Sequence, residues 1–557
     1  MILGTRHQRL RIASLAFTVI FFMLTAIAGA LHSGAVLEEG LVLTEANLVA
    51  HGSIIYRDFN YMYGPAGLWI VAGAFKLFGS SLATERIVSL LFALATVMAV
   101  WLLGNRYSLW LATISAVVCT VGLSAQYESG GAYAWPWRFA LCFSLFAIYL
   151  LTTDKYGRYK APFIAGLLVS AAVLTRFDFA IGLFPVVVIY FFRMKCKQRL
   201  RLFFGLTVAP IGYLYQFVVA GPSATFYQLF INPQRELPGN ALPIPPPTTY
   251  LAGWFDRLTS TLNKAPWFTS GVSDPVQLNI WFYFDILSYI VIATLLVYLF
   301  RTRPKGDKPM TLLSLFVFSV GLAPSTFQRS DVYHIMSLMI VLSVVLVLAF
   351  GEFMPFNRNW KGSMVIVTLA FVILTTLVAP NFYAAQWAFE LDTEIGLASQ
   401  PPFFVSNYGH EFIYGDKLSA SQIQSMLNYV DSISKPNQTL FVGTSNLSRT
   451  PVNDVELYYL LPQLKPATYF IILYPDIALH HAKHMASDLK TADYVILDSK
   501  YKNWSEPNES VLYGPRNSMN VLANDFCIAR KFGSFSVYVN RYKTALAPFV
   551  CKANSGS

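Results

Sequence analysis

A series of long apolar runs limits the folds that are open to this chain. The first run, Ile12–Leu31, has about 20 residues, which is enough to cross a hydrocarbon core about 30 Å thick. Because so many runs of this kind follow one another, we predict a multi-spanning α-helical membrane protein. The further runs, which bring the total to eleven, lie near 84–104, 108–125, 135–152, 161–175, 179–192, 202–220, 279–300, 309–324, 333–351 and 363–379.

The composition argues against a soluble enzyme. Of the 557 residues 55% are hydrophobic and only 13% are charged, where a soluble domain carries about 25% charged residues. The formal net charge of +11 could suggest a nucleic-acid partner. The basic residues, however, lie in small groups between apolar runs, which is typical of membrane proteins. We therefore expect membrane lipids and no nucleic acid as partners.

The basic residues also predict the orientation of the chain. Three arginines precede the first run, so its N-terminus should stay in the cytoplasm. A secretory signal is the alternative, but the apolar core exceeds the roughly 7–15 residues of such signals, and we favour a retained anchor. Alternate loops, which this orientation places in the cytoplasm, hold most of the basic residues that flank the runs. Their only acids are Asp154, Asp307 and Glu352. We expect a bacterial inner (plasma) membrane protein.

Eleven spans place the two chain ends on opposite sides of the membrane. We predict a transmembrane domain at 1–379, with external loops 32–83 and 221–278, and an extracytoplasmic soluble α/β domain at 380–557. The α/β assignment rests on an alternation of β-like and helix-like segments. The β-like runs are 440–443, 469–473, 494–498 and 534–539, and the helix-like stretches are 454–461 and 477–489.

The cysteines and the absence of known motifs exclude only a few classes of reaction. Cys527 and Cys551 both lie in the C-terminal region, where they could form a disulfide in an oxidising compartment or remain two free thiols. No Walker-type loop, paired CxxC or HExxH motif occurs in the sequence. Nucleotide hydrolysis and zinc chemistry are therefore disfavoured.

The first external loop begins with two acids, Glu38 and Glu39, ahead of a helix-like stretch that continues to Ala50. A carboxylate held at the level of the lipid headgroups has a raised pKa and can act as a general base. Alternatively, the two acids only favour a helix N-terminus through its dipole, which contributes about 0.3–1 kcal/mol.

Two further groups of charges belong to the same outer face. Arg138 follows Trp135 and Trp137 at the mouth of the fourth run, where an aromatic belt with a flanking arginine is also common as a plain interface anchor. Arg176 and Asp178 lie at the tip between the fifth and sixth runs. These two side chains could bind a substrate or simply neutralise each other.

A last group, with Arg329, Asp331 and His334, lies between the ninth and tenth runs. If the tenth helix begins near Asp331, then Asp331 and His334 share one face. Arg329 could hold a phosphate at the membrane surface with two parallel hydrogen bonds. A capping aspartate and a buried histidine are the alternative, and we favour the functional interpretation. Acids and arginines on one face suit a lipid phosphate held beside a carboxylate base.

The order of features in the N-terminal third resembles a known group. An apolar run, the acidic pair, a helix-like stretch, Tyr56-Arg57-Asp58-Phe59, Gly64-Pro65 and a second apolar stretch follow one another. This order is similar to that of the GT-C superfamily of integral-membrane glycosyltransferases. Within it, the chain most resembles the branch of protein O-mannosyltransferases and the lipid A aminoarabinose transferase. The resemblance extends more loosely to the other runs and to an external α/β tail.

The resemblance implies an inverting glycosyltransferase that moves a sugar from a polyprenyl-phosphate donor to a hydroxyl of a cell-envelope glycan, lipid or protein. Its acidic motif, usually with Asp, matches Glu38 and Glu39, of which we prefer Glu38 as the base. No cofactor is implied with certainty; a divalent metal is possible, since relatives differ in metal need. Arginines that hold the donor phosphate would be Arg138, Arg176 and Arg329, and further substrate-binding residues would be Arg57, Asp58, Tyr63, Asp178, Asp331 and His334.

Two other classes of protein remain as alternatives. A transporter or flippase of a lipid-linked or anionic solute would favour charges at mid-span and repeated halves with broken helices. The apolar runs are almost free of charge at their centres, and the two halves show no repeat. A non-catalytic assembly subunit would have no need for acids and arginines together in its loops.

Overall fold

The computed structural model describes residues 2–31, 34–124, 132–153, 160–244, 274–302, 307–353 and 403–544, together with 368 and 551. Helices occupy every predicted run from 12–31 to 333–351, and the run 363–379 lies outside the described residues. The prediction of a multi-spanning helical protein is thus confirmed. These helices are α1 (Ile2–Leu31), α4 (Leu82–Gly104), α5 (Leu109–Ser124), α6 (Pro136–Thr152), α7 (Ala161–Thr175), α8 (Phe179–Arg193), α9 (Cys196–Leu206), α10 (Val208–Ala220), α14 (Asp274–Thr302), α15 (Asp307–Gln328) and α16 (Val332–Phe353).

Six stretches of the described chain are helical, long and apolar enough to cross a membrane. Among them α16 is the most buried, and it packs against α5, α14 and α15. A helix that is apolar on all sides belongs in the interior of a bundle. The six stretches lie in α1, α4, α9 with α10, α14, α15 and α16, while α5, α6, α7 and α8 are shorter apolar helices.

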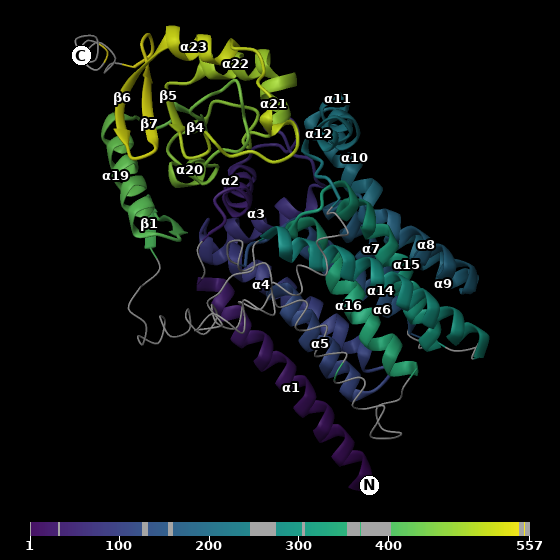
Figure 1. The fold of residues 1–557 in the computed structure, drawn as a ribbon. Coiled ribbons are helices and arrows are strands. Elements are labelled where there is room, and N and C mark those ends of the chain that lie inside the picture. Colours follow the sequence, from purple (N-terminus) through teal and green to yellow (C-terminus); the bar gives the residue numbers. More distant parts are fainter. Residues whose placement is uncertain are drawn as a thin grey trace.

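Two short helices, α2 (Glu38–Ala50) and α3 (Ala66–Phe78), lie between the helical bundle and the C-terminal sheet (Figure 1). One continuous apolar core joins Leu43 of α2, Val71 of α3 and Tyr459 of the C-terminal region, and all three are inaccessible to solvent. The C-terminal region therefore packs directly on the first loop of the chain. Three further short elements follow α10: α11 (Pro222–Phe226), the π-helix η2 (Tyr227–Ile231) and α12 (Asn232–Asn240).

The C-terminal region contains a five-stranded mixed sheet in the order β4-β3-β5-β7-β6. Strand β3 pairs in parallel with β4 and β5, whereas β7 pairs antiparallel with β5 and β6. The strands are β3 (Thr439–Thr444), β4 (Lys465–Pro466), β5 (Tyr494–Asp498), β6 (Phe526–Phe532) and β7 (Phe535–Asn540), and β1 (Phe403–Asn407) with β2 (His410–Tyr414) forms a separate hairpin. The helices of this region are α19 (Lys417–Ile433), α20 (Glu456–Leu460), α21 (Pro475–His480), α22 (Ala482–Thr491), α23 (Asn517–Asp525) and the 3₁₀-helix η4 (Glu509–Val511).

The α/β prediction is confirmed, with one error. The run 469–473 is not a strand, because its backbone groups are paired outside the sheet. The Asn453 side chain donates to the Ile471 carbonyl and accepts from the Leu473 amide, and the Asn60 amide donates to the Tyr469 carbonyl. Once these groups have partners, a neighbouring strand is not needed.

The two C-terminal cysteines form a disulfide. Cys527 lies on β6 and Cys551 lies beyond β7, and their Cα atoms are 5.7 Å apart. Of the two alternatives that the sequence left open, the structure has the bonded pair. The disulfide ties the end of the chain to the edge strand of the sheet.

Gly40 offers a test of the packing between α2 and α20. A Cβ atom at Gly40 would lie 2.8 Å from the Glu456 backbone nitrogen and 2.9 Å from its Cβ. We expect Gly40→Ala to lower the free energy of unfolding by about 1–3 kcal/mol, the usual cost of overpacking.

Thermal unfolding in detergent, followed by circular dichroism, measures this effect. The matched control is Gly73→Ala in α3, because a Cβ there meets nothing within 4 Å. This control should keep or raise the midpoint, since alanine favours a helix by about 1 kcal/mol over glycine. Equal midpoints for the two variants would contradict the close packing.

Candidate functional site

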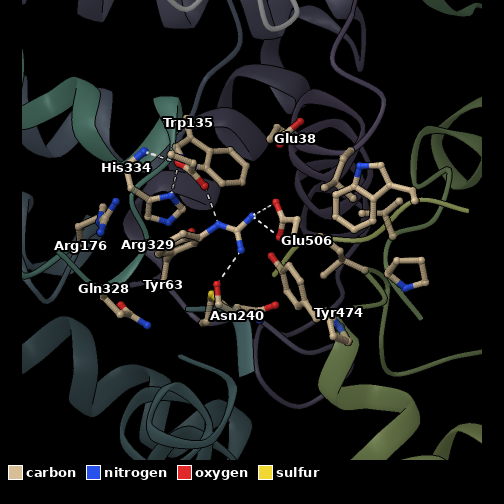
Figure 2. Close-up of a pocket in the computed structure, with 18 residues that line it drawn as sticks. Glu38, Tyr63, Trp135, Arg176, Asn240, Gln328, Arg329, His334, Tyr474 and Glu506 are labelled. Carbon is tan, nitrogen blue, oxygen red and sulfur yellow. Dashed lines mark hydrogen bonds and ion pairs between the residues drawn. The ribbon is translucent and has the colours of Figure 1, made fainter. Parts of the chain in front are cut away.

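A cavity of about 300 Å³ lies where the helical bundle meets the C-terminal region. Its lining joins loops that are far apart in the sequence, so only the folded chain forms it. Figure 2 shows Arg329 near its centre, with His334 on one side and Glu506 on the other. The bundle contributes Glu38, Tyr63, Trp135, Arg176, Asn240, Gln328, Arg329, Asp331 and His334, and the C-terminal region contributes Tyr474, Trp504 and Glu506, among others.

Glu38 reaches this cavity from the first turn of α2. Burial raises the pKa of its carboxyl from the ordinary 4.5 to about 7, and the negative charge of Asp331 adds to the rise. A hydrogen bond from the backbone and the positive charge of Arg329 act in the opposite direction. A group with a pKa near 7 can take up and release a proton near neutral pH.

Glu39 has a different environment, although it is the next residue. Its carboxylate forms a two-pronged ion pair with Arg86 of α4, at 2.7 Å from Nε and 2.8 Å from Nη2. The side chains of Arg86 and Glu39 are only 3% and 0% exposed. Burial raises the pKa of Glu39, and the charge of Arg86 opposes that rise. Glu39 does not line the cavity and instead holds α2 against α4.

Arg329 is fixed by three partners around the cavity. Its Nε donates to Asp331 at 2.6 Å, and its Nη1 donates to the Asn240 carbonyl at 2.7 Å. Its Nη2 lies 2.8 and 2.9 Å from the two carboxylate oxygens of Glu506. Charge-assisted hydrogen bonds of this kind hold a carboxylate or a phosphate, and here the single nitrogen Nη2 contacts both oxygens.

Asp331 precedes α16 and caps it, since its Oδ1 accepts from the His334 amide at 2.9 Å. The same oxygen lies 2.7 Å from Nδ1 of His334, so the two side chains share one face. Burial alone would raise the pKa of Asp331, but its interactions with His334 and the positive charge of Arg329 lower it to about 2. Asp331 therefore caps α16 and also lines the cavity.

Arg176 lines the cavity from the turn between α7 and α8. It pairs with Asp178 through Nε at 2.9 Å and Nη2 at 2.5 Å, and it lies over the Tyr63 ring with its Cζ 5.3 Å from the centroid. Asp178 is not among the lining residues, and its side chain is 38% exposed. Arg176 and Asp178 thus neutralise each other, which was one of the two interpretations of the sequence. Arg176 nevertheless lines the cavity.

Besides Glu39 and Asp178, three further predicted site residues lie outside the cavity lining. Arg138 of α6 is fully buried, with its guanidinium over the Trp137 ring and an Nη1 contact of 3.4 Å to the Ser89 hydroxyl. Arg57 and Asp58 form an exposed pair with each other in the turn after α2. The structure thus does not bring these three side chains into the cavity lining.

The sequence reasoning missed both the C-terminal wall of the cavity and the partner of Glu39. Glu506, Tyr474 and Trp504 lie in loops, and no local pattern marks them. The role of Arg86 could have been suspected from the sequence, because Glu85 and Arg86 are charged residues inside an apolar run. Such residues cost energy unless they are paired, so a buried partner could have been expected. Among the described residues, no group of three or more His, Cys, Asp or Glu could hold a metal ion.

Comparison with known proteins gives a likeness of fold. No protein-family model and no curated protein matches the chain. The Archaeoglobus fulgidus oligosaccharyltransferase, solved in complex with zinc and sulfate, superposes with a TM-score of 0.50 and 13% identity over 95% of this chain and 74% of that one. ArnT from Cupriavidus metallidurans in the apo state gives a TM-score of 0.51 and 12% identity over 95% and 98% of the two chains.

The buried pair of Glu39 and Arg86 predicts a large effect on stability. Arg86→Met leaves a buried carboxylate without its partner, and we expect the free energy of unfolding to fall by about 3–5 kcal/mol. The matched control is Arg57→Gln, which breaks an exposed pair and should change little. Thermal unfolding in detergent compares the two variants, and similar midpoints would refute a structural role for Arg86.

Proposed function

We propose that this chain, which has the fold of the GT-C superfamily of membrane glycosyltransferases, is an inverting glycosyltransferase. Its donor is a sugar on a polyprenyl phosphate, and its acceptor is a hydroxyl of a cell-envelope glycan, lipid or protein. The cavity between the helical bundle and the C-terminal region is the proposed active site.

One observation carries the proposal: a carboxyl with a raised pKa and two arginines line the same cavity. Glu38 supplies the carboxyl, and Arg176 and Arg329 supply the positive charge. A base needs a pKa near the working pH, and a departing phosphate needs fixed positive charge as its own negative charge grows. The two requirements of the transfer are therefore met in one place.

In the proposed step, one bond to the anomeric carbon forms as another breaks. The Glu38 carboxylate takes the proton of the acceptor hydroxyl, and the hydroxyl oxygen forms a bond to the anomeric carbon. The bond between that carbon and the phosphate oxygen breaks, and its electron pair stays with the polyprenyl phosphate. Attack from the face opposite the phosphate inverts the anomeric centre.

Glu506 is part of this proposal because it binds the Arg329 guanidinium, to which the donor phosphate would bind. Its two carboxylate oxygens lie against Nη2 of Arg329, a nitrogen that can equally donate to a phosphate oxygen. A donor phosphate therefore replaces Glu506 on Arg329, while Asp331 and Asn240 keep the guanidinium in place. His334 and Tyr63 complete the substrate contacts in the cavity.

The cavity is proposed to open on the outer face of a bacterial inner membrane, with the N-terminus in the cytoplasm. The basic loops predicted to be cytoplasmic support this orientation. The disulfide between Cys527 and Cys551 supports an oxidising compartment for the C-terminal region. Movement of intact lipid across liposomes by the purified protein would instead favour the flippase alternative.

Glu38→Gln tests the base. General-base assistance typically contributes roughly 10²–10⁴-fold, so we expect a loss of transfer of that size. Purified variants are incubated with radiolabelled polyprenyl-phosphate sugars and a crude cell-envelope acceptor. Glu411→Gln is the matched control, because Glu411 is an exposed acid on β2 and should keep full activity. Undiminished transfer by Glu38→Gln would falsify the assignment.

The raised pKa of Glu38 predicts how the rate depends on pH. The base must be deprotonated, so kcat/KM should rise as the pH increases through about 7 and level off above it. Rates measured from pH 5.5 to 8.5 give the apparent pKa. A carboxylate with an ordinary pKa near 4.5 would give a flat profile over this range, and such a profile would contradict the role of Glu38.

A further inference from the structure

A second cavity, of about 710 Å³, lies in the C-terminal region at the carboxyl ends of β3 and β5. The residues that follow these two strands form its walls. Thr444, Ser448 and Arg449 come from the end of β3 and its following loop, and Ser499 and Lys502 come from the loop after β5. We call this cavity the strand-end crevice.

The order of the strands explains why a crevice forms there. β3 and β5 are parallel neighbours, and the chain leaves them in opposite directions. From β3 it continues to β4 on one side of the sheet, and from β5 it continues to β6 and β7 on the other side. Where connections diverge in this way, the loops separate, and ligands bind outside the carboxyl ends of the strands.

The lining of the strand-end crevice is positively charged. It contains Arg449, Lys502 and Arg516 and no acidic residue. Lys502 and Arg516 are exposed, and neither forms an ion pair with another described residue. Two cations that are not neutralised attract a negative ligand.

Arg449 builds the wall instead of binding the ligand. Its Nε donates to the Ser510 carbonyl, its Nη1 donates to the Lys502 carbonyl at 3.1 Å, and its Nη2 donates to the Trp504 carbonyl. These bonds fix the loop that carries Lys502. The positions of the crevice cations therefore depend on a partly buried scaffold.

Hydroxyl and aromatic groups in the crevice suit a carbohydrate. Ser448 lines the crevice and is 5% exposed, and its buried hydroxyl has no hydrogen-bond partner among the described residues. Tyr513 is 64% exposed, with the Arg449 guanidinium 5.9 Å from its ring centroid. A tyrosine offers both a flat apolar face and a polar hydroxyl, which match the two sides of a sugar ring.

We propose that the strand-end crevice binds an acidic carbohydrate, with its negative groups on Lys502 and Arg516 and a sugar ring against Tyr513. The crevice adjoins the first cavity, because Pro451 lines both and residues 502–506 run from one to the other. A glycan held there would present its next residues to the proposed active site. This role as the acceptor site rests on the proposed function, whereas the binding itself does not.

Isothermal titration calorimetry on the full chain in detergent tests the binding directly, with trigalacturonate as the acidic probe and maltotriose as the neutral one. We expect saturable binding of trigalacturonate that weakens with salt and exceeds maltotriose binding at least tenfold. The double variant Lys502→Gln/Arg516→Gln should weaken trigalacturonate binding at least tenfold. The matched control Lys483→Gln/Lys531→Gln removes two exposed cations outside the crevice and should bind normally.

Three outcomes would overturn the proposal: no saturable binding of trigalacturonate, equal binding of the neutral probe, or normal binding by the crevice variant. The Glu38→Gln variant separates this proposal from the proposed function, because its crevice is intact and it should bind trigalacturonate like the wild type. Normal binding by a protein that never transfers sugar would refute only the enzymatic role.

Discussion

The buried ion pair between Glu39 and Arg86 determines where the rest of the site can be. Two hydrogen bonds join the Arg86 guanidinium to the two carboxylate oxygens of Glu39, and both side chains are buried. The pair therefore fixes the first turn of α2 on α4. Successive residues of a helix point about 100° apart, since a turn has 3.6 residues. With Glu39 held against α4, Glu38 must face another direction, which is toward the cavity. The acidic pair thus has two functions, one for each residue.

The cavity depends equally on the contact between the bundle and the C-terminal region. Arg329 comes from the bundle, yet one of its three partners, Glu506, comes from the C-terminal region. The shared apolar core around α2, α3 and α20 holds the two parts together, so this ion pair does not have to do so alone. The side chains of Arg329 and Glu506 are 21% and 22% exposed, and in the proposed reaction the donor phosphate takes the place of Glu506.

The sequence predicts the helical bundle well, because the length and apolarity of each run are enough to identify a membrane-spanning helix. It also predicts β3, β5 and β7, whereas 469–473 fails because Asn453 and Asn60 bond its backbone from outside the sheet. Charged residues between the apolar runs were enough to predict Glu38, Arg176 and Arg329, and these three residues line the same cavity. Arg138 and Arg57 were predicted by the same reasoning, but Arg138 lies over the Trp137 ring and Arg57 pairs with Asp58. Glu506 could not be found, since only tertiary contact brings its loop to Arg329.

The segment from Lys502 to Ser510 connects the two cavities physically. Arg449 holds this segment by three carbonyls, and Glu506 lies within it. One end of the segment lines the strand-end crevice through Lys502, and its middle lines the first cavity through Trp504 and Glu506. The proposed carbohydrate on Lys502 and the proposed phosphate on Arg329 would therefore both contact the same short stretch of chain. A displacement of the backbone between Lys502 and Ser510 would act against the three bonds that Arg449 makes.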